Sequence, residues 1–142
     1  MHSCLLTGGA GFIGSCLIRQ LIGNRKTRVV NFDKLTYAGN MDSLESVIHD
    51  PLHQFVQGDI CDRSVVEDVL ETCRPSAIIH LAAESHVDRS IDGPGEFVET
   101  NVKGTFALLE AVTAYWKKLP ADERDNFRFV HVSTDEDRKS VV

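Results

Sequence analysis

The sequence contains little that would build a disulfide framework or a metal site. Its four cysteines are Cys4, Cys16, Cys61 and Cys73, and no two of them form a C-x-x-C pair. None has a histidine at the spacing of a zinc finger. This pattern disfavours a redox or metal-binding role, and we therefore expect reduced cysteines at core or near-core positions.

The sequence also lacks an excess of basic residues and a long apolar run. The formal net charge is -6 and the pI is about 5.4, so there is no basic surface for nucleic acid. No apolar stretch approaches the roughly 18–20 residues of a membrane span. The short N-terminal apolar run has no charged leader and is interrupted by glycines. We expect a cytoplasmic protein that binds neither nucleic acid nor membrane.

The 142 residues show instead a regular alternation of strand and helix patterns. Apolar runs predict strands at 4–6, 28–32, 54–57, 77–81 and 127–132. Periodic patterns predict helices at 12–22 and 42–48, from Asp62 to just before Pro75, and at 96–118, where Val98, Val102, Leu109, Val112 and Trp116 lie near one face. The alternation predicts one α/β domain, with helices on both faces of a parallel sheet.

A glycine-rich turn joins the first predicted strand to the first predicted helix. Gly8, Gly11 and Gly14 stand at G-x-x-G-x-x-G spacing, and Phe12 and Ile13 begin the helix. Glycines at such a turn let the backbone approach a pyrophosphate, which the helix N-terminus then attracts. The alternative is an ordinary strand-to-helix turn, and the motif alone is weak evidence for a dinucleotide site.

Acidic residues follow the second and third predicted strands. Asp33 comes about twenty residues after the turn, where a carboxylate binds the adenosine ribose of NAD and repels the additional phosphate of NADP. Asp59 and Ile60 suit an adenine pocket, with a polar group and an aliphatic wall. The alternatives are a capping aspartate at position 33 and a loop aspartate beside a helix start at position 59.

Polar residues gather after the fourth predicted strand. We interpret His80 as a core or near-core histidine, whereas the small residues Ala82 and Ala83 allow a flat ring to approach the backbone. The polar residues that follow are Ser85, His86, Asp88 and Arg89. Ligands bind at the carboxyl ends of parallel strands, and Arg89 suits either a phosphate contact or an ion pair with Asp88.

An acidic pair follows the fifth predicted strand. Asp135 and Glu136 come directly after Ser133-Thr134 at the same expected edge of the sheet. Two neighbouring carboxyl groups can serve as general acid and general base if their environments separate their pKa values. The alternative is a helix cap or a solvated acidic turn.

Together these motifs resemble the extended short-chain dehydrogenase/reductase family, and within it the nucleotide-sugar 4,6-dehydratases that act on dTDP-glucose. The resemblance rests on the glycine turn, the segments 33–40, 58–60 and 80–90, Thr100-Asn101, and the sequence Thr134-Asp135-Glu136. It implies a Rossmann-type doubly wound parallel sheet, here truncated after the fifth strand. The expected domain covers residues 1–136, and the tail 137–142 does not resemble the family.

The resemblance also implies a cofactor, a substrate and a reaction. NAD would take a hydride from C4 of the sugar and return it to C6. Asp135 would protonate the departing hydroxyl and Glu136 would remove the C5 proton. The substrate would be a nucleotide sugar, dTDP-glucose first, contacted by Ser85 and Thr134. The implied NAD contacts are Gly8, Gly11, Phe12, Ile13, Gly14, Asp33, Lys34, Leu35, Thr36, Asp59, Ile60, Leu81, Ala82, Ala83 and Thr100.

The sequence departs from the family after Glu136. The family's Tyr-x-x-x-Lys motif is missing, since Met41 and Leu119 stand where a lysine would follow Tyr37 and Tyr115. We expect an incomplete, inactive N-terminal fragment of a protein that forms a homodimer at full length. Other NAD-dependent nucleotide-sugar epimerases or dehydratases and a non-catalytic nucleotide-binding module remain alternatives, although the related 4-epimerases lack the acidic pair.

Overall fold

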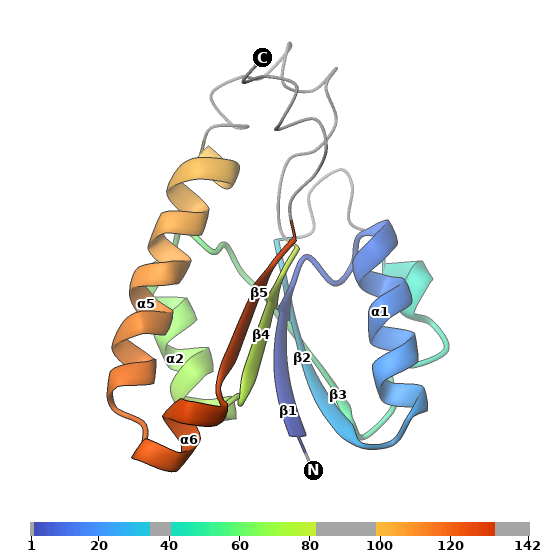
Figure 1. Ribbon diagram of the computed structural model, residues 1–142. Helices are drawn as coiled ribbons and strands as arrows, with labels where there is room; N and C mark the ends of the chain where they lie inside the picture. The colour runs from blue at the N-terminus through green and yellow to red at the C-terminus, as the bar shows by residue number, and fades with distance from the viewer. Residues whose placement is uncertain (1, 35–40, 82–98, 133–142) are drawn as a thin grey trace, which may run out of the picture.

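The computed structural model describes residues 2–34, 41–81 and 99–132. Within them, a parallel sheet of five strands has the order β3-β2-β1-β4-β5 (Figure 1). The strands are β1 (His2–Thr7), β2 (Thr27–Asp33), β3 (His53–Gln57), β4 (Ala77–His80) and β5 (Arg128–His131). The expected α/β doubly wound fold is confirmed. The chain moves outward from β1 to β3 and then continues on the other side of β1, so the strand order reverses between β1 and β4.

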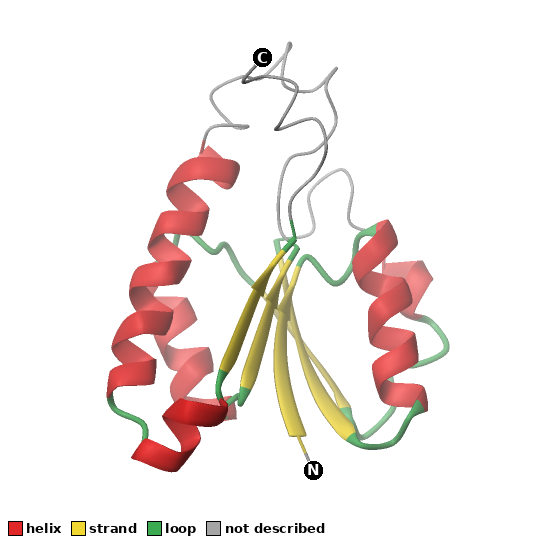
Figure 2. Ribbon diagram, in the orientation of Figure 1, coloured by secondary structure: helices red, strands yellow, loops and turns green. Residues whose placement is uncertain are grey.

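Helices cover both faces of the sheet (Figure 2). The helix α1 (Phe12–Gly23) and the 3-10 turn η1 (Met41–Leu44) lie on one face. The helices α2 (Arg63–Cys73) and α5 (Thr105–Lys117) pack together on the other face. A π-helical turn, η2 (Glu99–Gly104), precedes α5, and a short helix, α6 (Ala121–Asn126), leads into β5.

Local sequence signals explain where several of these elements begin and end. Asp62 is the N-cap of α2, and its carboxylate accepts the Val65 N–H. The helix ends at Arg74, which adopts a left-handed conformation with φ 48° just before Pro75. The β1 residues from Cys4 to Thr7 are all buried, as expected for a parallel strand with helices on both faces.

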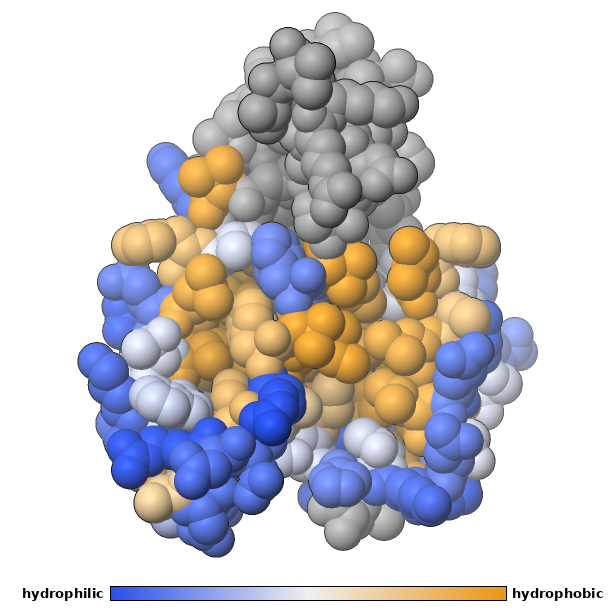
Figure 3. Space-filling view, in the orientation of Figure 1, coloured by the Kyte–Doolittle hydropathy of each residue, from blue (hydrophilic) through white to orange (hydrophobic). Residues whose placement is uncertain are grey.

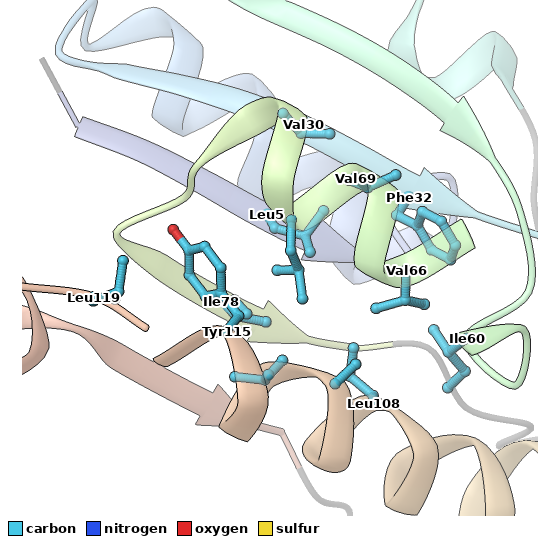
Figure 4. Close-up of a cluster of buried hydrophobic side chains, with 13 residues drawn as sticks. Leu5, Val30, Phe32, Ile60, Val66, Val69, Ile78, Leu108, Tyr115 and Leu119 are labelled. Atoms are coloured by element: carbon cyan, nitrogen blue, oxygen red, sulfur yellow. The ribbon is translucent and has the colours of Figure 1, made fainter. Parts of the chain in front are cut away.

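The apolar side chains form one cluster on each face of the sheet. Under α2 and α5 the buried residues are Leu5, Val30, Phe32, Ile60, Val66, Val69, Leu70, Ile78, Leu108, Ala111, Val112, Tyr115 and Leu119 (Figure 4). Under α1 and η1 they are Leu6, Ile18, Ile22, Val29, Leu44, Val47 and Leu52. Alternate residues of each strand therefore serve opposite faces.

One predicted helix is wrong, and one helix of the structure was not predicted. Residues 42–48 form no α-helix: the 3-10 turn Met41–Leu44 is followed by hydrogen-bonded turns, such as the Glu45 N–H donating to the Asp42 carbonyl. The helix predicted at 96–118 is present from Glu99 to Lys117, as the π-helical turn η2 that continues into α5, and residues 96–98 lie outside the described ranges. The helix α6 has no apolar stripe and was not predicted.

Most of the apolar face predicted for the long helix is not its buried face, although Val112 is buried as predicted. Val102, Leu109 and Trp116 are 63%, 42% and 38% exposed, together with Phe106 at 62%. The buried residues of α5 are Leu108, Ala111, Val112 and Tyr115. The helix carries apolar side chains around much of its circumference, and only those that face α2 and the sheet are buried.

The cysteines are free thiols, but one is not where we expected it. Cys4 is buried in β1, and Cys61 and Cys73 are half-buried, whereas Cys16 is exposed. Cys16 lies on α1 away from the face that carries Ile18 and Ile22, which pack on the sheet. The expectation of a core or near-core position is therefore wrong for Cys16.

The strand β5 is an edge of the sheet as far as the structure is described. Its register places Val130 beside Ile79, and Val130 and Val132 are 48% and 41% exposed. Figure 3 shows apolar side chains gathered across the middle of this view, between the α5 side and the α1 side. None of the helices in the described ranges has the length and apolarity needed to cross a bilayer.

Candidate functional site

The glycine turn connects β1 to α1 at the carboxyl edge of the sheet. Gly8 has a positive φ of 78°, and its N–H donates to the Phe32 carbonyl at 2.9 Å. The Gly11 N–H then donates back to the Gly8 carbonyl at 3.2 Å. The turn thereby reverses the chain within a few residues and starts α1 directly above the end of β1.

Gly14 packs on the backbone of the turn. A Cβ atom at position 14 would lie 2.3 Å from the Gly8 carbonyl oxygen and 2.8 Å from the Gly9 Cα. At Gly9, a Cβ would lie 2.1 Å from Asn31 Oδ1 and 2.4 Å from Ile18 Cδ1. The lack of side chains at these two positions lets α1 approach the sheet closely, which is the packing role expected for such glycines.

The N-terminus of α1 is open to a ligand. Its N-cap, Gly11, provides no capping side chain, so N–H groups of the first turn have no side-chain acceptor there. Phe12 and Ile13 in that turn are 91% and 63% exposed. N–H groups that no side chain of the described residues caps, together with the positive end of the helix dipole, favour an anion.

Asp33 ends β2 beside this turn and contacts it. Its side chain is almost buried, and Oδ2 accepts the Ala10 N–H at 2.8 Å. The β1–β2 register pairs Thr7 with Phe32, so Asp33 lies level with the start of the turn. This hydrogen bond brings Asp33 to the glycine turn, and its role in binding NAD stays a prediction.

Lys34, Asp59 and Ile60 lie between the ends of β2 and β3 and the start of α2. The Lys34 ammonium is 3.2 Å from Asp59 Oδ2, and Asp59 Oδ1 accepts the Cys61 N–H at 2.9 Å. Partial burial raises the pKa of Asp59, but these two contacts outweigh that effect and the net pKa is lowered. Ile60 is buried in the core, where it packs on Gly104.

The remaining predicted site residues are only partly within the described ranges. Leu81 is half-buried after β4, and its N–H donates to Thr7. Thr100 lies in the turn η2. The residues outside the described ranges are Leu35, Thr36, Ala82, Ala83, Ser85, Thr134, Asp135 and Glu136.

Asn31 is a residue of this site that the sequence reasoning missed. It lies on β2 beneath Gly9 and is fully buried, and neither its Oδ1 nor its Nδ2 has a hydrogen-bond partner among the described residues. Leaving a buried amide unpaired costs about 1–3 kcal/mol. A polar residue inside an otherwise apolar strand pattern was the signal available in the sequence.

His80 at the end of β4 is a core histidine, as predicted. It is 1% exposed, and its two ring nitrogens contact Thr7 Oγ1 at 2.7 Å and Thr105 Oγ1 at 2.9 Å. Its ring stacks on that of His131, with centroids 5.0 Å apart. Burial, and then the neighbouring His131, lower the pKa of His80 to about 4, so the imidazole is neutral at physiological pH.

A comparison of the sequence with known protein families shows to which family the chain belongs. The sequence profile of the family described as GDP-mannose 4,6 dehydratase matches residues 5–137. The chain belongs to the GDP-mannose 4,6 dehydratase family. The matched range includes the glycine turn, Asp33, Asp59 and the Asp135-Glu136 pair.

Individual members and solved structures agree with this relationship. The chain is 56% identical over 136 residues to a dTDP-glucose 4,6-dehydratase of Neisseria meningitidis, covering 96% of this chain and 38% of the relative. A Bacillus anthracis dTDP-glucose 4,6-dehydratase in complex with NAD superposes with a TM-score of 0.79 at 34% identity, over 96% of this chain and 38% of that one. The dTDP-glucose 4,6-dehydratase DesIV of Streptomyces venezuelae, with NAD and TYD bound, gives 0.74 at 47% identity, over 80% and 36%.

This member of the GDP-mannose 4,6 dehydratase family therefore spans about 38% of the length of the curated relatives that it matches. The described part of the chain carries the glycine turn, Asp33 at the end of β2 and Asp59 after β3. The acidic pair expected to act on the substrate follows β5, outside the described ranges.

Gly14→Ala is expected to lower the free energy of unfolding by about 1–3 kcal/mol, because the new methyl group would overlap backbone atoms that cannot move aside. Gly23→Ala, at the other end of α1, is the matched control, since a Cβ there has nothing within 4 Å. We expect the control to be neutral or stabilising. Urea unfolding followed by circular dichroism measures both, and equal stabilities would contradict the packing role of Gly14.

Stability should depend on pH through His80. Its folded pKa of about 4 lies below the ordinary 6.5, so the unfolded chain binds more protons between these values and stability falls as the pH is lowered through this window. His80→Gln removes this titration. Urea unfolding between about pH 7 and pH 4.5 should show a shallower slope for the variant than for the parent. An unchanged slope would show that His80 titrates normally.

Proposed function

We propose that this chain forms the NAD-binding part of a dTDP-glucose 4,6-dehydratase. The observation that carries the proposal is the Asp33 carboxylate, held by the Ala10 N–H beside an α1 N-terminus without a capping side chain. The α1 N-terminus follows β1, at the point where the strand order reverses and where doubly wound sheets bind ligands, and Asp33 ends the neighbouring strand β2. The identity to dTDP-glucose 4,6-dehydratases supports the choice of substrate.

The residues of the turn fit NAD. Gly8, with its positive φ, and Gly14, packed on Gly8, form a turn that a phosphate can approach without meeting side chains. The N–H groups of the first turn of α1 would hold the pyrophosphate, and the Asp33 carboxylate would accept hydrogen bonds from the adenosine ribose. The same carboxylate would repel the additional phosphate of NADP. Two solved relatives contain NAD.

Bound NAD supplies a hydride acceptor for C4 of the sugar and a hydride donor for C6. The chain's own residues would carry the protons between these transfers. We assign Asp135 to the acid that protonates the departing C6 hydroxyl and Glu136 to the base that removes the C5 proton, with Ser85 and Thr134 contacting the substrate. Their support is their order in the sequence: Thr134, Asp135 and Glu136 follow β5, whose neighbour β4 ends at the proposed site.

The proton of the C4 hydroxyl needs a base that the described residues do not provide. Tyr115 is 6% exposed and its hydroxyl donates to the Pro75 carbonyl at 2.8 Å, so it supports the core. The chain contains two tyrosines, and neither begins a Tyr-x-x-x-Lys motif. We therefore propose that these 142 residues bind NAD without completing the reaction, and that the family domain ends near 136, before the tail 137–142.

We also propose that the full-length form is a cytoplasmic homodimer. The support for a dimer is the exposed apolar face of α5 and η2, formed by Val102, Phe106, Leu109 and Trp116. These residues recur at helical spacing, and a helix that presents an apolar stripe to solvent suits packing against another helix.

Asp33→Ala is expected to weaken NAD binding by about 10- to 100-fold, because it removes a charged acceptor from the ribose hydroxyls and from Ala10. It should also reduce the preference for NAD over NADP. The matched control is Asp68→Ala, on the exposed side of α2. Isothermal titration with both cofactors measures these effects, and an unchanged NAD affinity in Asp33→Ala would refute the ribose contact.

The 142-residue chain should bind NAD but form no 4-keto sugar from dTDP-glucose. Loss of a positioned base costs about 10²–10⁴-fold in rate. Purified chain is incubated with NAD and dTDP-glucose, and 4-keto sugar formation is followed by absorbance in alkali, with a complete relative as positive control. Clear turnover would overturn the proposal that this chain is incomplete as a catalyst.

A further inference from the structure

A partly buried network of hydrogen bonds joins β1, β4 and α5 beneath the proposed NAD site. Thr7 ends β1 and His80 ends β4, and the strand register pairs them. His80 Nδ1 is 2.7 Å from Thr7 Oγ1, and Nε2 is 2.9 Å from Thr105 Oγ1 on α5. Thr7 Oγ1 also accepts the Leu81 N–H at 3.1 Å. These contacts join two strands and a helix whose residues are widely separated in the sequence.

The residues of this hydrogen-bond network lie next to segments of the proposed NAD site. Thr7 immediately precedes Gly8, the residue with positive φ that begins the glycine turn. Leu81 is itself a predicted NAD contact. Thr105 follows Gly104, on which Ile60 packs so closely that a Cβ at position 104 would lie 2.7 Å from Ile60 Cδ1. The His80 ring therefore contacts Thr7, which adjoins the glycine turn and binds the Leu81 N–H, and Thr105, which adjoins the Gly104–Ile60 contact.

We propose that His80 is a positioning residue for NAD, which holds the glycine turn, Leu81 and the start of α5 in register through Thr7 and Thr105. This inference rests on the proposed function. The imidazole does not contact the cofactor in this proposal. It fixes the relative positions of the groups that do, so that they need not be ordered when the ligand binds.

The chemistry of the ring suits this task. In this arrangement the Thr7 hydroxyl accepts from Leu81 and donates to Nδ1, and the Nε2–H donates to Thr105 Oγ1. His131 stacks on the ring from β5, and Phe129 lies beside it with centroids 6.4 Å apart. These neighbours restrict ring rotation, and a neutral ring with one donor and one acceptor satisfies both threonines.

A purely structural histidine would have the same contacts, so the test must separate affinity from stability. Thr105→Val removes the hydroxyl with little change of shape, whereas Thr105→Ser keeps it. Thr113→Val makes the same chemical change at an exposed position of α5. Each variant of the 142-residue chain is titrated with NAD by calorimetry, and its thermal unfolding is followed by circular dichroism.

We expect Thr105→Val to weaken NAD binding about fivefold to tenfold, with Thr105→Ser and Thr113→Val close to the parent. His80→Gln removes the ring that contacts both threonines, so it should show a similar loss, and it provides the test if Thr105→Val does not fold. Wild-type NAD affinity in a folded Thr105→Val or in His80→Gln would overturn the positioning role, even if thermal stability fell.

Nitrogen NMR of the parent chain, labelled with ¹⁵N-histidine, provides an independent readout. We expect His80 to be the neutral Nε2–H tautomer at about pH 7, and its ring signals to shift when NAD is added. A protonated ring or the Nδ1–H tautomer would overturn the proposed direction of the hydrogen bonds. Absence of NAD binding by the parent would instead refute the proposed function, and this inference with it.

Discussion

The close packing of Gly14 on Gly8 is the contact on which the rest of the site depends. A Cβ at position 14 would lie 2.3 Å from the Gly8 carbonyl oxygen, so only glycine allows the first turn of α1 to lie on the turn that follows β1. This contact places the N-terminus of α1 at the carboxyl edge of the sheet. The carboxylate of Asp33 reaches the same turn and accepts the Ala10 N–H. The N-terminus of α1 and the Asp33 carboxylate, for which we propose the phosphate and ribose contacts, are thereby fixed relative to each other.

Buried polar groups surround this turn on both faces of the sheet. Asn31 lies beneath Gly9 on the α1 face, and His80 lies beneath the end of β1 on the α5 face. The two residues differ in hydrogen bonding, because both ring nitrogens of His80 contact threonine hydroxyls, whereas the Asn31 amide has no partner within the described ranges. An apolar core would be a simpler way to stabilise such a sheet, and polar residues kept at a cost in stability are typical of functional sites.

Much of the fold could be predicted from the sequence, because buried parallel strands are short apolar runs and helices are periodic. The positions of β1, β2 and α1 follow from these patterns, and Asp62 marks the start of α2. The predictions failed where local sequence patterns do not determine the type of helix or which of its faces is buried. Residues 42–48 carry helical signals but form only a short 3-10 turn. The apolar side chains of Val102 in η2 and Leu109 in α5 are exposed, because burial depends on which part of the helix meets α2 and the sheet.

The sequence by itself determined the order of the elements, the glycine turn with its close-packed positions, and the acidic residue after β2. These features depend on residues near one another in the chain, and local steric rules govern them. Only the tertiary structure decided that Ala10 binds Asp33, that Asn31 lies beneath Gly9, and that His80 joins Thr7 to Thr105. Such contacts depend on strand order and register, which bring distant residues together and which no local pattern specifies.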